Sequence, residues 1–273
     1  MNWKTFFTPG ANMSPQEARD FMAAHPRDSY QILDVRQPKE YEQGHLAGAL
    51  LMPVKEVGSR SAELDRDKPL LVYCHSGVRS KAASQLLLAD GFKDVYNMNG
   101  GIVAWQGEKV SGGELQGLEF FMGLEYPDVF QMAYAMEEGL RQLYMALAKR
   151  VTDQLDSQKL LERLAAFEEG HKAKLLAMFA PDDFRGDKAG ASMTMEGGFD
   201  QQQILAHFGP QLKTIEDILQ LGMMLEAQAL DLYSRLARKS ENEKSRELFN
   251  FLAKEEAQHL SSLAEELDKA LAG

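Results

Sequence analysis

The chain has 273 residues, of which 44% are hydrophobic and 26% charged, an ordinary globular composition with length enough for two domains. Its net charge of −11 argues against nucleic-acid or membrane partners, since both are recognised through basic patches. A single cysteine, Cys74, excludes an internal disulfide or a CxxC metal knuckle and suits a reducing compartment. No apolar run approaches the roughly 20 residues of a membrane span, and the first residues lack a signal-like segment. We therefore expect a cytoplasmic protein.

Residues 1–110 alternate helical and strand-like patterns. Ser14 and Glu17 form a capping box that predicts the start of a helix at Pro15. The segment RSKAASQLLLADG predicts another helix, which ends at Gly91. Strand-like runs are QILDV (31–35), ALLMPV (49–54), LLVYC (70–74) and DVYNM (94–98). The alternation predicts an α/β domain, a mainly parallel sheet with flanking helices.

Cys74 follows an apolar strand and precedes a helix, at the sheet edge where α/β folds place their sites. Backbone N–H groups at a helix N-terminus stabilise a thiolate. Gly77 lets the intervening loop curl, and Arg79 adds a positive charge at its mouth. The pattern predicts a nucleophilic sulfur in a nest for anions.

The motifs of this part resemble the rhodanese family along its whole length. They are LDVR (33–36), Glu40, GHLAGA (44–49), CHSGVRS (74–80) and NGGIVAW (99–105). The resemblance implies that Cys74 accepts a sulfane sulfur as a persulfide and passes it to a thiol or to cyanide. It implies a catalytic loop of six residues, with His75 on its rim and Asp34, Arg36 and Glu40 in supporting roles. The loop is Cys74, His75, Ser76, Gly77, Val78 and Arg79.

Loop length separates the chemistries that this fold supports. Related phosphatases and arsenate reductases have one residue more between Cys and Arg, which admits a larger tetrahedral anion. The Cys-x4-Arg spacing from Cys74 to Arg79 therefore favours sulfur transfer.

A Gly-rich linker at 111–125 leads into an all-helical part at 126–273. Four long helical patterns are expected at about 127–150, 156–179, 212–238 and 241–270, the last opened by a capping box of Ser240 and Glu243. The irregular segment 180–211 is longer than a usual helix–helix loop and suits a crossover between parallel helices. The pattern predicts a four-helix bundle.

Two kinds of polar pair recur in this part. Helices two and four each carry Glu-x-x-His, and helices one and three each carry Glu followed seven residues later by Tyr. Positions three and seven apart share a helix face, and both kinds of pair fall on apolar stripes at matching distances from the interhelical turns. All six groups can therefore meet in one layer. The groups are Glu137, Glu168, His171, Glu226, Glu256 and His259.

Four buried carboxylates are costly without cations, and two divalent metals would offset their charge. Carboxylate and imidazole ligands suit iron or manganese, with zinc as a further option. The arrangement resembles ferritin-like di-iron bundles, closest to rubrerythrin. The resemblance implies that all six groups are ligands of two iron ions, with Glu168 and Glu256 bridging and Tyr144 and Tyr233 beside them. Rubrerythrin proper adds a four-cysteine iron site and a further carboxylate where Ala229 stands here.

We expect a sulfurtransferase fused to a di-iron bundle that reduces peroxide or oxygen. The alternative is a metal-handling protein, in which the bundle binds or oxidises Fe(II) and the rhodanese part supplies or senses sulfur. Expected partners are a small sulfur donor such as thiosulfate or a persulfide, a thiol acceptor, an external electron donor and a second copy of the chain. The charged neighbours Glu169 and Glu255 are expected on the surface, and His207 is expected to be structural.

Overall fold

The computed structural model describes residues 11–121, 128–151, 155–182, 184 and 201–272. The chain divides into two compact units, Met1–Glu114 and Leu115–Gly273, and each is described by itself. The elements of the first unit are β1 (Ala11–Met13), α1 (Pro15–Ala24), η2 (Arg27–Ser29), β2 (Gln31–Asp34), α2 (Pro38–Gln43), β3 (Leu50–Leu51), α3 (Val57–Arg60), η3 (Ser61–Glu63), β4 (Leu70–Tyr73), α4 (Val78–Ala89), β5 (Val95–Met98) and α5 (Gly101–Ala104).

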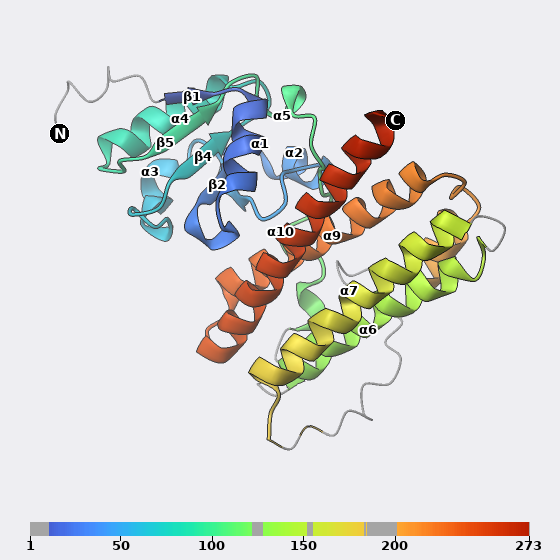
Figure 1. Ribbon diagram of the computed structural model, residues 1–273. Coiled ribbons are helices and arrows are strands. Elements are labelled where there is room, and N and C mark those ends of the chain that lie inside the picture. Colours follow the sequence, from blue (N-terminus) through green and yellow to red (C-terminus); the bar gives the residue numbers. More distant parts are fainter. Residues whose placement is uncertain (1–10, 122–127, 152–154, 183, 185–200, 273) are drawn as a thin grey trace. The chain divides into compact units, whose positions relative to one another are not determined.

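The first unit is built on a five-stranded parallel sheet with the order β1-β5-β4-β2-β3 (Figure 1). Helices cover both faces, so the inner strands are buried on either side and read as continuous apolar runs. Ile32 faces the layer that contains Tyr41 of α2 and Ile102 of α5, whereas Leu33 faces the layer with Leu87 of α4. The sheet therefore separates two apolar cores.

Close backbone approach shapes the loop after β4. Gly101 has φ +61, and a Cβ added there would lie 2.5 Å from Cys74 O and from the His75 carbonyl. Gly77 has φ +96, and its Cβ would lie 3.0 Å from the Gly100 nitrogen. Positive φ favours glycine because other residues clash with their own backbone there. The two glycines let the turn after β5 pack directly against the cysteine loop.

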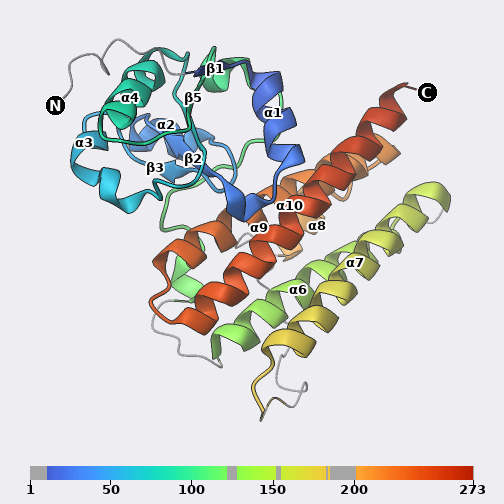
Figure 2. The same cartoon turned by 60° about the vertical axis from the view of Figure 1, so that its left-hand side comes forward.

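The second unit is all-helical. Its elements are η4 (Leu118–Phe120), α6 (Asp128–Ala148), α7 (Leu155–Phe179), α8 (Gln201–His207), α9 (Ile215–Lys239) and α10 (Glu243–Ala272). Both views show α6 beside α7 and α9 beside α10 (Figures 1 and 2). Contacts of α7 with α9 and α10 join the two hairpins into the predicted four-helix bundle. The core consists mainly of Leu side chains, and the fully buried Leu140, Leu161 and Leu219 belong to it.

Residues 115–121 pack on the bundle. Phe121 meets Phe249 of α10 edge to face, with the ring centroids 5.2 Å apart. Arg235 of α9 is 4% exposed, pairs with Asp231 at 2.8 Å and donates to Gln116 O at 2.6 Å. A buried, paired arginine thus holds the start of the second unit against α9.

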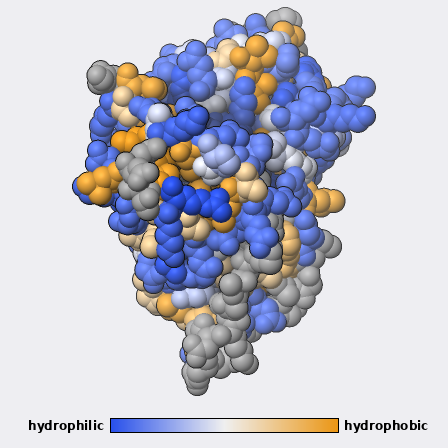
Figure 3. Space-filling view, turned by 90° about the vertical axis from the view of Figure 1, so that its right-hand side faces the viewer, coloured by the Kyte–Doolittle hydropathy of each residue, from blue (hydrophilic) through white to orange (hydrophobic). Residues whose placement is uncertain are grey.

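The surface of the described residues is mixed. On the face in Figure 3, hydrophilic residues surround separate apolar areas. None of the described helices is both long enough and apolar enough to cross a membrane.

The structure confirms the predicted fold class, an α/β unit followed by a helical bundle. The capping box of Ser14 and Glu17 is present. The one expected at Ser240 and Glu243 is wrong, because Ser240 closes α9 and the Asn242 side chain accepts from Ser245 N instead. Strand β1 was not expected from the sequence, since its three residues have no apolar alternation. The expected crossover lies partly outside the described residues and contains the short helix α8.

We predict that Gly101→Ala lowers the free energy of unfolding of the first unit by about 2–4 kcal/mol, because it combines a left-handed backbone with overpacking against the loop. The matched control is Gly58→Ala, where an added Cβ meets nothing within 4 Å. Both tryptophans, Trp3 and Trp105, precede residue 115, so tryptophan fluorescence in denaturant follows this unit alone. Equal midpoints for the two variants would contradict the prediction.

Candidate active-site loop and candidate metal centre

Cys74 lies directly after β4 and before α4, at the carboxyl end of the parallel sheet. Its side chain is 1% exposed. The Gly77 backbone N–H donates to Cys74 Sγ at 3.1 Å, and the Ser80 hydroxyl lies 3.4 Å from the same sulfur. The loop thus turns donors onto the sulfur, as the nest predicted from the sequence requires.

These donors decide the ionisation of the thiol. Burial acts to raise the pKa of Cys74, but the Ser80 hydroxyl and the backbone N–H groups of Ser80, Gly77 and Ser76 outweigh it, so the pKa is lowered. A thiolate is the nucleophilic form of cysteine. The geometry therefore supports a reactive sulfur rather than an inert buried thiol.

The rest of the loop surrounds the sulfur. His75, Ser76 and Val78 are exposed. The half-buried Arg79 forms two hydrogen bonds of 2.7 Å with Glu40, which lower the pKa of that carboxyl to about 2. The positive charge expected at the mouth is thus shared with a carboxylate of α2.

A second ion pair supports the loop's surroundings. Arg36 and Asp34 are buried, with a closest separation of 2.6 Å, and Arg36 also donates to Gly44 O at 2.7 Å. These contacts join the end of β2 to the segment after α2.

In the bundle, the structure brings together all six predicted ligands. Glu137, Glu168, Glu226, Glu256 and His171 are buried, and His259 is half-buried. Potential ligand atoms lie within 4.8 Å of one another in three overlapping groups. The groups are Glu137, Glu168 and His171; Glu168, Glu226 and His259; and His171, Glu256 and His259.

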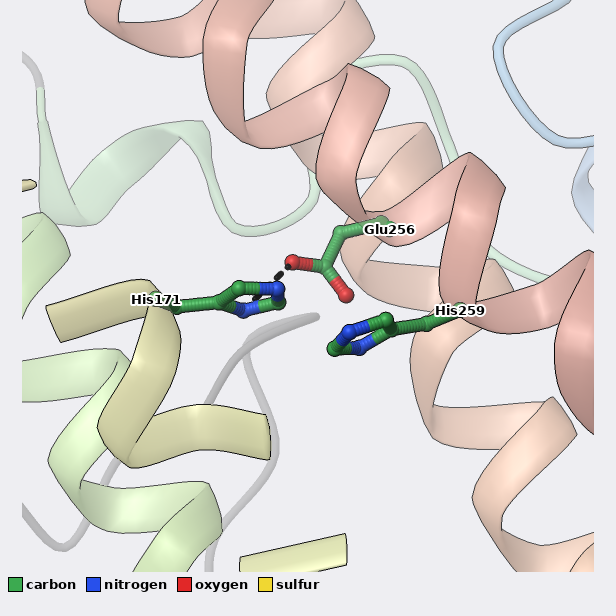
Figure 4. Close-up of side chains that lie close together, drawn as sticks. All are labelled: His171, Glu256 and His259. Atoms are coloured by element: carbon green, nitrogen blue, oxygen red, sulfur yellow. Dashed lines mark ion pairs between the residues drawn. The ribbon is translucent and has the colours of Figure 1, made fainter. Parts of the chain in front are cut away.

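His171 is at the centre of the cluster. Its Nδ1 lies 3.0 Å from Glu137 Oε2, 3.5 Å from Glu168 Oε2 and 3.4 Å from Glu256 Oε1. Figure 4 shows the His171 ring, from α7, and the Glu256 and His259 side chains, from α10, turned toward one another. The two imidazole rings stack with centroids 4.3 Å apart. Side chains from both hairpins therefore share one layer.

Each of the two tyrosines bonds to a glutamate of the other helical hairpin. Tyr144 of α6 donates to Glu226 Oε1 of α9, and Tyr233 of α9 donates to Glu137 Oε1 of α6, both at 3.3 Å. The sequence placed each tyrosine in line with the glutamate of its own helix, whereas the structure directs each to the glutamate of the other repeat. The exchange links the hairpins at the level of the cluster.

Two buried groups of this cluster, Glu168 and His171, have pKa values far from those of the same groups in water. Burial, together with Glu226, raises the pKa of Glu168 well above its usual range. Burial alone would lower the pKa of His171, but Glu137 and Glu168 raise it to about 11. In the absence of another cation the cluster thus retains protons.

The donor set fits divalent metal ions. Within the described residues, neither oxygen of Glu168, nor Glu226 Oε2, nor His259 Nδ1 has a hydrogen-bond partner. Buried polar atoms are rarely left unsatisfied, because each costs free energy. Carboxylate oxygens and imidazole nitrogens at such spacing would be satisfied by coordination to iron, manganese or zinc.

Sequence reasoning misplaced one charged neighbour. Glu169 is exposed, as expected, but Glu255 is 9% exposed, and its Oε2 lies 3.8 Å from His171 Nε2 and contacts Lys174. A spacing of four residues places Glu255 between Phe251 and His259 on the stripe that faces α7, a signal that could have located it. The other missed residues are Ser80, whose hydroxyl lies 3.4 Å from Cys74 Sγ, and Asn97, which accepts a hydrogen bond from Ser80. His207 ends α8 and meets the ring of Phe208.

Two family models match the chain. A model of the rhodanese-like domain matches residues 14–108, and a model of rubrerythrin matches residues 128–267. These ranges follow the division into an α/β unit and a helical unit.

Individual relatives match the first unit. The uncharacterised protein YqhL of Bacillus subtilis is 41% identical over 78 residues, which are 29% of this chain and 62% of YqhL. The thiosulfate sulfurtransferase GlpE of Coxiella burnetii is 40% identical over 75 residues, which are 28% of this chain and 70% of GlpE. A crystal structure of a rhodanese-like domain protein from Staphylococcus aureus is 26% identical with a TM-score of 0.33, covering 35% of this chain and 90% of that one.

Each of the two candidate sites lies inside one of the matched ranges. Cys74 and its loop are inside the first matched range, and the carboxylate and histidine cluster is inside the second. The chain belongs to the rubrerythrin family through residues 128–267, preceded by a rhodanese-like domain at residues 14–108.

Proposed function

We propose that this chain transfers sulfur through a persulfide on Cys74 and that its bundle carries a two-metal redox centre. The observation that supports the first part is the buried Cys74 sulfur, which accepts from Gly77 N and lies 3.4 Å from the Ser80 hydroxyl. The thiosulfate sulfurtransferase similar to the first unit supports the substrate class, a small sulfane-sulfur donor. A thiol or cyanide is the acceptor.

The transfer has two balanced steps. The Cys74 thiolate attacks the outer sulfur of thiosulfate, a Cys74–sulfur bond forms, and the sulfur–sulfur bond of the donor breaks with its electron pair leaving on sulfite. The persulfide anion takes up the charge that the thiolate lost, so the N–H donors of the loop stabilise both forms. Cyanide then attacks the outer sulfur and leaves as thiocyanate, which restores the thiolate.

In the bundle, Glu137, Glu168, His171, Glu226, Glu256 and His259 would hold two metal ions, with iron as the proposed metal. Such a centre would supply electron transfer to an oxidant such as peroxide or oxygen. Tyr144 and Tyr233 hold the carboxylates of Glu226 and Glu137 in place through their hydroxyl protons. The single cysteine of the sequence is too few for a four-cysteine iron site, so the proposal includes an external electron donor.

We predict that Cys74→Ser abolishes thiocyanate formation from thiosulfate and cyanide, because a serine hydroxyl is not ionised at neutral pH. Mass spectrometry should detect one added sulfur atom on the wild-type chain after incubation with thiosulfate and none on the variant. The metal content of the variant is the internal control and should be unchanged. Thiosulfate turnover by Cys74→Ser would refute the sulfurtransferase proposal.

We predict that Glu168→Gln combined with Glu256→Gln removes metal, because two of the four acidic ligands become neutral while side-chain volume is kept. Elemental analysis should find about two metal ions per chain in the wild type and almost none in the double variant. The matched control, Glu169→Gln, changes an exposed glutamate next to Glu168 and should retain the metal. Equal metal content in all three proteins would show that the proposed ligands are wrong.

We predict that the iron-loaded protein turns over hydrogen peroxide when a chemical reductant is present, and that the double variant does not. Consumption of peroxide and reductant would be followed together, since a redox cycle uses both. Uptake and oxidation of Fe(II) without repeated turnover would instead favour the metal-handling alternative.

A further inference from the structure

A series of buried side-chain hydrogen bonds connects Cys74 to the sheet. Ser80 of α4 is 0% exposed, and its hydroxyl donates to Asn97 Oδ1 at 2.6 Å. Asn97 of β5 is 2% exposed, and its Nδ2 donates to Asn12 Oδ1 of β1 at 2.8 Å. The same Ser80 oxygen lies 3.4 Å from Cys74 Sγ. This series thus runs from the Cys74 sulfur through the Ser80 hydroxyl and the Asn97 amide to the edge strand β1.

Packing alone does not explain Asn97. It is paired with Val72 across β4 and β5, and its neighbour on the same face of β5 is the core residue Val95. An amide at such a position costs free energy unless it is hydrogen-bonded. The bond to Asn12 uses its nitrogen, which leaves Oδ1 facing Ser80.

The Ser80 hydroxyl has one proton and two acceptors within reach. While Cys74 is a thiol, the proton satisfies Asn97 Oδ1, and the Ser80 oxygen can accept from the S–H group. When Cys74 becomes a thiolate, the sulfur needs a donor, and the same proton can satisfy it only by leaving Asn97. The two acceptors therefore compete for one proton.

We propose that Ser80 is a positioning residue whose hydroxyl proton turns from Asn97 Oδ1 to Cys74 Sγ as the thiol ionises, and that Asn97 limits how strongly the thiolate is favoured. The inference deepens the proposed sulfur transfer and rests on Cys74 as its nucleophile. In this step the S–H bond of Cys74 breaks and its proton passes to the solvent, while the Ser80 hydroxyl rotates and keeps its own proton. No bond between heavy atoms forms or breaks.

Ser80 is better placed for this role than the other groups near the Cys74 sulfur. Arg79, whose guanidinium is held by Glu40 of α2, and the exposed His75 are the charged or titratable groups next to Cys74 in the loop. Gly101 of α5 packs against the loop, and Asn97 of β5 accepts a hydrogen bond from Ser80. Neither residue has an ionisable side chain. Among the interactions that lower the pKa of Cys74 against burial, the Ser80 hydroxyl is the largest.

The test measures the rate at which iodoacetamide alkylates the full-length protein as a function of pH. Cys74 is the only cysteine in the sequence, so the midpoint of this profile reports its ionisation directly. We expect Ser80→Ala to raise the midpoint by about one pH unit, since the thiolate loses a hydrogen bond. Ser80→Thr keeps the hydroxyl and should restore a midpoint near that of the wild type.

Two further variants sharpen the result. Asn97→Leu removes the competing acceptor at similar volume and should lower the midpoint, opposite in sign to Ser80→Ala. Ser84→Ala is the matched control, because Ser84 is on the same helix, is 1% exposed and has no hydrogen bond from its hydroxyl within the described residues. It should leave the profile unchanged.

An unchanged midpoint in Ser80→Ala, or equal shifts in Ser80→Ala and Ser80→Thr, would overturn the role of Ser80. A rise in Asn97→Leu would overturn the competition. Tryptophan fluorescence checks that each variant is folded. If Asn97→Leu does not fold, the comparison of Ser80→Ala with Ser80→Thr still tests the role of Ser80. The assay contains no sulfur donor, so failure of sulfur transfer in the wild type would leave its result standing.

Discussion

The second unit depends on one electrostatic constraint, the burial of four glutamates around two imidazoles. Like charges at this separation repel strongly in a low-dielectric interior, and each carboxylate also loses its hydration. His171 meets three of the carboxylates through one nitrogen, and the crossed tyrosines restrain two of them. The same bundle contains an apolar core, to which the fully buried Leu140 and Leu219 belong, and its packing opposes the repulsion within the cluster.

The two units stabilise negative charge in different ways. At Cys74 a single negative charge is met by neutral donors, the N–H groups of the loop and the Ser80 hydroxyl, which need no ion and are already oriented. In the bundle, neutral donors are too few, because Glu168 accepts no hydrogen bond within the described residues. Dipoles therefore suffice for one sulfur, whereas the buried carboxylates and imidazoles of the cluster form a donor set that suits divalent cations.

The recurring polar pairs of the four helices explain both what sequence periodicity could predict about the bundle and what it could not. Residues three and seven apart share a helix face, so Glu168 with His171 and Glu256 with His259 were recognisable as inward pairs. Periodicity describes one helix at a time. It therefore could not show that Tyr144 donates to Glu226, because that contact crosses between two helices.

The sequence by itself determined the fold class, the cysteine loop and the identity of the six acidic and imidazole groups. These follow from local rules: strand and helix periodicity, the glycines around the loop, and the spacing of polar residues on apolar stripes. Only the tertiary structure decided which side chains meet, such as Arg79 with Glu40 and Ser80 with Asn97. The partners in these pairs are far apart along the chain, and their contact depends on strand order and on helix packing, which local patterns do not encode.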